Sequence, residues 1–180
     1  KNVQLASDNS TIAVTFDEAV YSTNNGSGAL DTADFVFSIA GGSATLSSTA
    51  PTSISASSNT YTLGIGLSGL ADGNEVITVK PASNAIFDGG YNAASTTQSN
   101  NTATLNDRAG PKISSVAIAA DNSTIAVTLN EASYKTNSGS GSLEKNDFVF
   151  SLTGGTATLS STTPSSISAD GNVYTLGVTI

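Results

Sequence analysis

The stretch DNSTIAVT occupies Asp8–Thr15 and is repeated letter for letter at Asp121–Thr128. Extending the comparison outward aligns residues 8–67 with residues 121–180 without a gap, and about two-thirds of the aligned positions are identical. An offset of 113 residues is too long for one solenoid unit and close to the usual length of a whole domain. The sequence therefore predicts a tandem array of one domain type.

Apolar and polar residues alternate within the repeated segments. In STIAVTF (Ser10–Phe16), one side of the chain carries Ile12, Val14 and Phe16, and the other side carries Thr and Ala. This period of two is typical of a half-buried β-strand. The same pattern predicts further strands near residues 3–5 and at 34–39, 61–67 and 75–81. Gly-, Asn- and Ser-rich turns separate these strands, and no helical periodicity is present, so we expect an all-β fold of the antiparallel sandwich type.

The alternation also predicts which side chains form the core, because a register slip of one residue would expose the whole set. In the first repeat the expected core is Ile12, Val14, Phe16, Phe35, Phe37, Leu63 and Ile65. The expected counterparts in the second repeat are Ile125, Val127, Leu129, Phe148, Phe150, Leu176 and Val178. Thr11, Ala13 and Thr15 should face away from the core.

The composition excludes several kinds of partner. The chain has no Cys, His, Met or Trp, and 14 acidic against 6 basic residues give a formal net charge of −8. This charge repels nucleic-acid phosphates and anionic membrane surfaces. No apolar run approaches the roughly 18 residues of a membrane span. We expect no nucleic-acid partner and no membrane insertion.

The composition also indicates a location. Charged residues make up only 11% of the chain, and Ser, Thr, Asn, Gly and Ala take their place. Low-charge β proteins of this kind are commoner outside the cell. Extracellular eukaryotic sandwiches often contain disulfides, which a chain without Cys lacks. An extracellular location on a bacterial cell surface is therefore expected.

The residue types in the chain give little support for an enzyme. Without His or Cys, the common nucleophilic mechanisms and the usual zinc sites are absent. The paired carboxylates Asp17–Glu18 become Asn130–Glu131 in the second repeat. Lys135 and Lys145 have no lysine counterpart in the first repeat, as expected for solvated loop positions. We expect a protein that is not an enzyme, with no catalytic residue.

Calcium is the one cofactor that the residues suggest, because Ca²⁺ takes six to eight oxygen ligands and acidic side chains are plentiful. Candidate ligands are Asp31, Asp34, Asp88, Asn92 and Asp107, with a site expected at the Asp88–Asp107 junction or beside Asp31 and Asp34. Binding would be weak, with a dissociation constant on the order of 10⁻⁴–10⁻³ M.

A purely structural role for the acidic residues is the alternative. In this interpretation Asp8 and Asp121 form Asx-turns, and Asp34 and Asp147 cap a turn before a strand. No DxDxDG loop is present to strengthen the calcium hypothesis, and the structural role is favoured.

The order of motifs DNSTIAVTFDEAVY, DFVFSI, EVITV, IFDGGYN and DRAGPKISSV resembles the bacterial immunoglobulin-like repeats of S-layer and giant surface-adhesin proteins. The F-x-E-x-V pattern of that family is matched by Phe16, Glu18 and Val20, and its Asp…Pro junction by Asp107 and Pro111. In the closing turn DGGYN, Tyr91 stands where the family has Gly, and the neighbouring Gly90 is expected to take any left-handed position.

The resemblance implies tandem immunoglobulin-like antiparallel β-sandwiches, with repeat 1 at residues 1–106, a junction at 107–113 and an incomplete repeat 2 at 114–180. It implies a non-enzymatic stalk or spacer in a long cell-surface adhesin or extracellular filament that serves cell adhesion. Its partners would be neighbouring repeats of the same or another copy of the protein. The alternative is a module whose loops at 22–33 and 135–146, the most divergent segments, bind a surface glycan or a receptor.

The second repeat stops at Ile180, the counterpart of Leu67, so strands equivalent to 75–81 and 102–105 are not present. A sandwich without them should keep unpaired or partner-paired edges and an exposed apolar face, whereas repeat 1 should be closed. We expect either a window of a longer array or strand addition by another chain.

Overall fold

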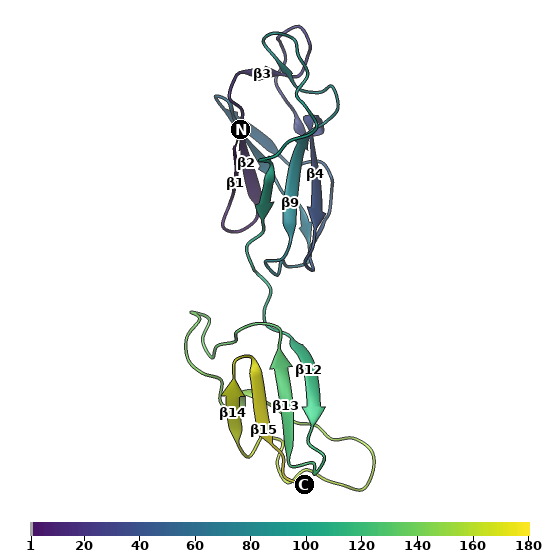
Figure 1. Cartoon of the computed structure of the whole chain (residues 1–180), viewed down its shortest axis with the longest axis vertical. Coiled ribbons are helices and arrows are strands. Elements are labelled where there is room, and N and C mark those ends of the chain that lie inside the picture. Colours follow the sequence, from purple (N-terminus) through teal and green to yellow (C-terminus); the bar gives the residue numbers. More distant parts are fainter. Residues whose placement is uncertain (1) are drawn as a thin grey trace. The chain divides into compact units, whose positions relative to one another are not determined.

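The computed structural model describes residues 2–180 and separates the chain into two compact units, Lys1–Ala109 and Gly110–Ile180 (Figure 1). These are called unit 1 and unit 2, and each is described by itself. The division falls inside the junction predicted at 107–113. All paired strands are antiparallel, so the predicted all-β fold of the sandwich type is confirmed.

Unit 1 contains two sheets that face one another across a shared core. The first sheet has the order β1-β2-β7-β6, with bounds β1 Asn2–Leu5, β2 Thr11–Thr15, β7 Thr60–Gly64 and β6 Ile54–Ser57. The second has the order β11-β9-β4, with bounds β11 Thr102–Thr104, β9 Val76–Pro81 and β4 Phe35–Ala40. The 3-10 turn η1, Thr32–Asp34, leads into β4.

Two short ribbons complete unit 1. One pairs β3 (Val20–Tyr21) with β10 (Phe87–Asp88), and the other pairs β5 (Thr45–Leu46) with β8 (Leu67–Ser68). The strand predicted at 61–67 is therefore divided between β7 and β8, which corrects the prediction. The chain leaves the sheet at Gly64, where the side chains of Thr52 and Ser53 lie in the space that a Cβ would need.

The core of unit 1 lies between the two sheets and contains all seven predicted residues. Phe16, Phe35 and Tyr61 form an aromatic cluster with ring centroids 5.7–6.4 Å apart. Ile77 and Val79 of β9 close the core from the second sheet. Thr11 and Ala13 are half-buried and Thr15 is exposed, so the predicted register of β2 is confirmed.

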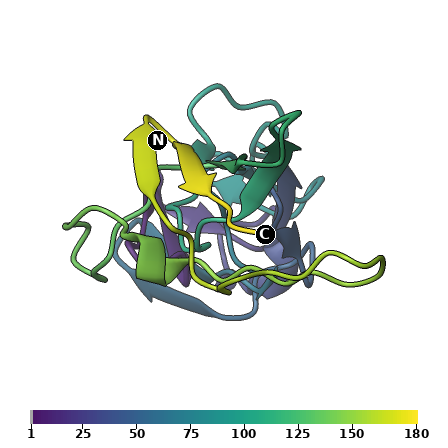
Figure 2. The same ribbon diagram turned by 90° about the horizontal axis from the view of Figure 1, so that it is seen from below.

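Unit 2 repeats only the first of these sheets. Its strands have the order β12-β13-β15-β14, with bounds β12 Ile113–Ile118, β13 Thr124–Leu129, β15 Val173–Gly177 and β14 Ile167–Asp170. The 3-10 turn η2, Lys145–Asp147, corresponds to η1. Beyond η2 the yellow-green segment runs to β14 as a loop without a strand arrow in Figure 2. Residues 148–153, the counterpart of β4, therefore form no strand.

The predicted core of unit 2 is only partly correct. Val127, Leu129 and Leu176 are buried, together with Tyr174. The other four predicted residues, Ile125, Phe148, Phe150 and Val178, are only half-buried. The reason is that nothing in unit 2 takes the place of β9, which covers the equivalent side chains in unit 1.

Candidate functional site

Asp31 and Asp34 build the turn that precedes β4. The Asp31 Oδ1 atom accepts a hydrogen bond from the Ala33 N–H (2.7 Å), and Asp34 Oδ2 accepts one from the Asp31 N–H (2.8 Å). Burial raises the pKa of Asp34, and the Asp31 hydrogen bond opposes that rise. The predicted capping role of Asp34 is thus confirmed. The predicted Asx-turns are also confirmed, because Asp8 and Asp121 each accept a hydrogen bond from the N–H two residues ahead (3.0 Å).

Asp88 and Asn92 form a second tight turn after β10. Asp88 Oδ1 accepts hydrogen bonds from the N–H groups of Asn92 (2.9 Å) and Gly90 (2.8 Å), and these donors lower the pKa of Asp88. Tyr91, with φ of +70°, holds the left-handed position here, whereas the prediction gave it to Gly90. The Tyr91 N–H donates to the Asp88 carbonyl oxygen (3.1 Å), and this hydrogen bond closes the turn.

The structure separates the two halves of the predicted junction site. Asp107 lies beside Gly73 and accepts a hydrogen bond from the Ala109 N–H (3.0 Å), at the end of unit 1 where the chain leaves. Asp88 is the last residue of β10 in the β3–β10 ribbon, which lies at the other end of the unit (Figure 1). Asp88 and Asn92 lie together as expected, but Asp107 does not join them, so the expected cluster of all three is wrong. Across residues 2–180, no three acidic side chains come together in a group that could hold a metal ion.

Because the carboxylates of Asp31, Asp34 and Asp88 already accept backbone hydrogen bonds, we expect calcium to contribute nothing to the stability of unit 1. The melting temperature measured by circular dichroism should be the same in about 1 mM CaCl₂ and after EGTA treatment. This calcium concentration is on the order of the dissociation constant expected for a weak site. A rise with calcium that Asp88→Asn abolishes would show that Asp88 is a ligand.

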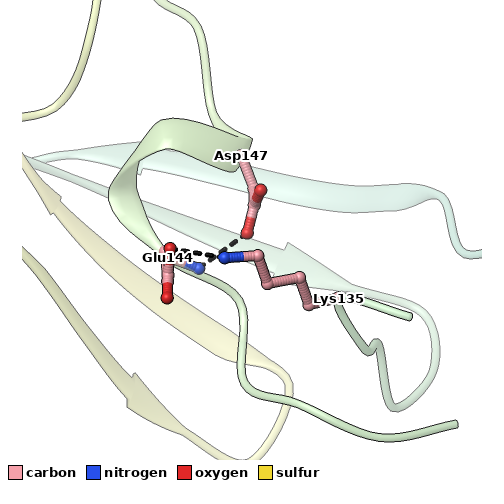
Figure 3. Close-up of polar contacts among 3 residues, drawn as sticks. All are labelled: Lys135, Glu144 and Asp147. Atoms are coloured by element: carbon pink, nitrogen blue, oxygen red, sulfur yellow. Dashed lines mark hydrogen bonds and ion pairs between the residues drawn. The ribbon is translucent and has the colours of Figure 1, made fainter.

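The divergent loop of unit 2 carries an ion pair that unit 1 lacks. Lys135 Nζ lies 2.6 Å from Glu144 Oε2, and the Glu144 N–H donates to Asp147 Oδ2 (2.8 Å), as Figure 3 shows. The hydrogen bond to Glu144 raises the pKa of Lys135. Both partners are substantially exposed, and exposed ion pairs contribute little stability. The pair orders the loop before η2 and creates no reactive group.

A buried carboxylate in unit 1 was missed by the sequence analysis. Glu75, just before β9, is fully buried. Its Oε1 accepts hydrogen bonds from the N–H groups of Ser43 and Ala44 (both 2.8 Å), and its Oε2 accepts one from the Asp72 N–H (3.0 Å). Glu75 thereby ties the start of β9 to the turn that follows β4. The available signal was a lone acidic residue at the head of an apolar strand, NEVITV.

Two glycines make room for this carboxylate. Gly41 and Gly42 both have positive φ, +79° and +58°. A Cβ at Gly42 would overlap the carboxylate of Glu75, and a Cβ at Gly41 would overlap the backbone oxygen of Asn74. The Gly-Gly pair therefore serves both the turn and the close approach of the strand.

Unit 2 retains the same turn without an occupant. Gly154 and Gly155 have φ of +79° and +70°, and within residues 2–180 no other atom lies within 4 Å of the position of a Cβ at either. Thr156 and Ala157 correspond to Ser43 and Ala44, and their N–H groups have no hydrogen-bond partner in the described chain. Ala157 is exposed, whereas Ala44 is buried.

Beside this turn lies an apolar hollow of about 180 Å³ on unit 2. We call it, together with the turn at 154–157, the open face. Its apolar lining includes Ile118, Ile125, Phe150, Leu152, Leu159 and Val178. Leu152 is 47% exposed, whereas its counterpart Ile39 in unit 1 pairs with Ile77 of the neighbouring strand β9 and packs against the core. The open face combines unpaired N–H donors with uncovered apolar surface, and both features suit the binding of an extended strand.

No protein-family model, curated protein or solved structure matches this chain. Within the described residues, no helix is long and apolar enough to cross a membrane.

Proposed function

We propose that this chain is a non-enzymatic structural repeat of a long bacterial cell-surface adhesin or extracellular filament, in which it acts as a stalk or spacer. The internal repeat supports the proposal, because a gapless 113-residue offset is typical of tandem arrays. The resemblance to immunoglobulin-like repeats of S-layer and adhesin proteins supports it further. Neighbouring repeats are the partners that such an array requires.

The observation that carries the proposal is a hydrogen-bonded link between the turn after β1 and the exit segment of unit 1. Asn9, only 3% exposed, lies in the turn after β1, and Asn106 follows β11. Asn9 Nδ2 donates to the Asn106 carbonyl oxygen (2.8 Å), and the Asn106 N–H donates to Asn9 Oδ1 (2.9 Å). Asn106 Nδ2 also donates to Asn9 Oδ1 (2.9 Å) and to the Ala6 carbonyl oxygen (3.2 Å).

This link suits a unit that carries tension between its ends. The Leu5 end of β1 lies next to the exit segment, because Ala6 contacts Asn106, so the Asn2 end lies away from it. A pull on the two ends then acts along β1. The four β1–β2 register pairs and the Asn9–Asn106 link bear the load together instead of opening one at a time.

Single-molecule pulling along two axes tests the proposal. The chain has no cysteine, so introduced cysteines are unique attachment points. One variant carries Asn2→Cys and Gly110→Cys and is pulled end to end. The other carries Asn2→Cys and Thr15→Cys, which pair across β1 and β2, so the pull peels β1 away. We expect a higher unfolding force end to end, and an equal or lower force would refute the stalk function.

Asn9→Gly should lower the end-to-end unfolding force of unit 1. Glycine accepts the φ of +62° at this position, so the change removes the side chain without backbone strain. Because the Asn106 N–H loses its buried partner, the free energy of unfolding should fall by roughly 1–3 kcal/mol. Ser58→Gly is the matched control, since Ser58 is exposed with φ of +52° and its counterpart is Gly171. Equal losses in the two variants would show that the link carries no load.

A further inference from the structure

We propose that the open face of unit 2 binds an extended strand that begins with a carboxylate and continues with apolar residues at alternate positions. The ligand class is an acidic-headed β-strand of the kind that unit 1 contains at Glu75–Pro81. This proposal does not depend on the stalk function, because it concerns unit 2 alone, whereas the pulling experiment reports on unit 1.

Two backbone N–H groups in the described part of unit 2 lack the carboxylate that their counterparts bind in unit 1. In unit 1 the two N–H groups after the Gly-Gly pair donate to Glu75, both at 2.8 Å. In unit 2 the same turn keeps its two left-handed glycines, and the N–H groups of Thr156 and Ala157 have no partner in residues 2–180. Two adjacent N–H donors beside open space form an anion-binding concavity. A carboxylate at the head of a strand would occupy it as Glu75 does.

Apolar residues of unit 2, as far as the structure describes it, lack the neighbouring strand that β9 provides in unit 1. In unit 1, Val79 of β9 stands opposite Phe37, and Ile77 stands opposite Ile39. Both β9 side chains are almost completely buried. The counterparts in unit 2 are Phe150, which is half-buried, and Leu152, which is 47% exposed. A strand in the position of β9 would place two apolar side chains beside Phe150 and Leu152 and would remove apolar surface from water.

Within the described chain, the backbone of residues 148–153 is hydrogen-bonded along one edge only. The Phe37 N–H donates to the Thr49 carbonyl oxygen (2.7 Å), and the Phe150 N–H donates to the Thr162 carbonyl oxygen at the same distance. Residues 148–153 are thus held on one side as β4 is. Because N–H and C=O directions alternate along an extended chain, Val149 and Ser151 face the other side, and neither makes a hydrogen bond in the part of the chain described. That edge is ready to pair with an incoming strand.

The occupant is a strand segment of this chemistry and not a second copy of unit 2. Packing of two open faces against each other would bury the apolar side chains. It would bring no carboxylate to the N–H groups of Thr156 and Ala157, because the lining of the open face contains no acidic residue. A strand that begins with a carboxylate can satisfy these N–H groups, whereas a second copy of unit 2 cannot, so the strand is the expected occupant.

The experiment uses the whole chain and a labelled peptide of residues 72–81, DGNEVITVKP. Fluorescence anisotropy measures binding, and calorimetry measures the melting temperature of unit 2. We expect saturable binding that raises the transition of unit 2 and leaves that of unit 1 unchanged. A peptide with Glu75→Gln should bind at least about tenfold more weakly, because charge-assisted hydrogen bonds are roughly twice as strong as neutral ones.

Two variants of the chain locate the binding site. Gly155→Asn places a side chain where the carboxylate would lie, while Asn tolerates the positive φ, and binding should be lost. Gly139→Asn is the matched control, since Gly139 has φ of +72° with open space around it, and it should bind like the wild type. No binding of the peptide, equal binding of the two peptides, binding to Gly155→Asn, or a chain dimer that the peptide does not dissociate would each overturn the proposal.

Discussion

Glu75→Ala is expected to lower the free energy of unfolding of unit 1 by roughly 3 kcal/mol, because the buried N–H of Ala44 and the partly buried N–H groups of Ser43 and Asp72 lose a charged acceptor. For a unit of this size, that loss corresponds to a fall in melting temperature of roughly 15 °C. Calorimetry of the whole chain measures it, and the transition of unit 2 should not move. Glu18→Ala, at an exposed position, is the control and should leave both transitions in place.

The pH dependence of unit 1 should carry the signature of Glu75. Burial by itself raises the pKa of Glu75, but the N–H groups of Ala44, Asp72 and Ser43 outweigh it and hold the pKa below its ordinary value of 4.5. Because the pKa of this carboxyl group is lower in the folded state, its ionisation stabilises unit 1 at pH values above its ordinary pKa. This stabilisation is lost as the pH falls through the folded-state pKa. We expect unit 1 to lose stability on acidification below pH 4.5, and Glu75→Gln to reduce that loss. The same acid dependence in the wild type and Glu75→Gln would contradict the assignment.

Phe37→Ala should destabilise unit 1 by roughly 4 kcal/mol, because Phe37 is 1% exposed and its removal leaves a cavity between two sheets. Phe150→Ala changes the identical residue in unit 2, where the ring is half-buried beside the open face. The expected loss there is roughly 1–2 kcal/mol, since much less apolar area returns to water. Denaturant titration and, separately, calorimetry of each variant measure the two losses in the free energy of unfolding.

The wild-type chain should show two separate transitions, with unit 2 melting first, because its core lacks a covering sheet. A single shared transition, or equal losses for the two Phe→Ala variants, would mean that unit 2 is as well closed as unit 1. Addition of the 72–81 peptide should bring the two transitions closer together if the open face binds it.

Strand positions were predictable because alternation is a local property. The register of β2 and the burial of Ile12 and Val14 follow from the letters STIAVTF alone. The Asx-turn at Asp8 was predictable for the same reason, since its partner is two residues ahead. The break after Gly64 was missed, because Leu67 and Ser68 pair with β5, a strand far from them in the sequence.

The candidate sites were harder to predict, because proximity in sequence is not proximity in space. Asp88 and Asp107 are near one another in the chain and lie at opposite ends of unit 1. Glu75 is far in sequence from Ser43 and Ala44, and the fold brings them to hydrogen-bonding distance. No local pattern identifies the partners in such a contact; the acidic residue that begins the apolar strand and the Gly41–Gly42 pair are only indirect signals.

The sequence by itself determined that residues 8–67 recur at 121–180, where most strands begin and which side chains face inward. Only the tertiary structure decided whether those inward side chains are covered. Phe35 and Phe148 occupy the same place in the same DFVFS motif, yet the first is buried and the second half-buried. Alternation depends on neighbouring residues, whereas burial depends on a partner strand far away in the chain. Unit 1 has that partner in β9, and the described part of unit 2 does not.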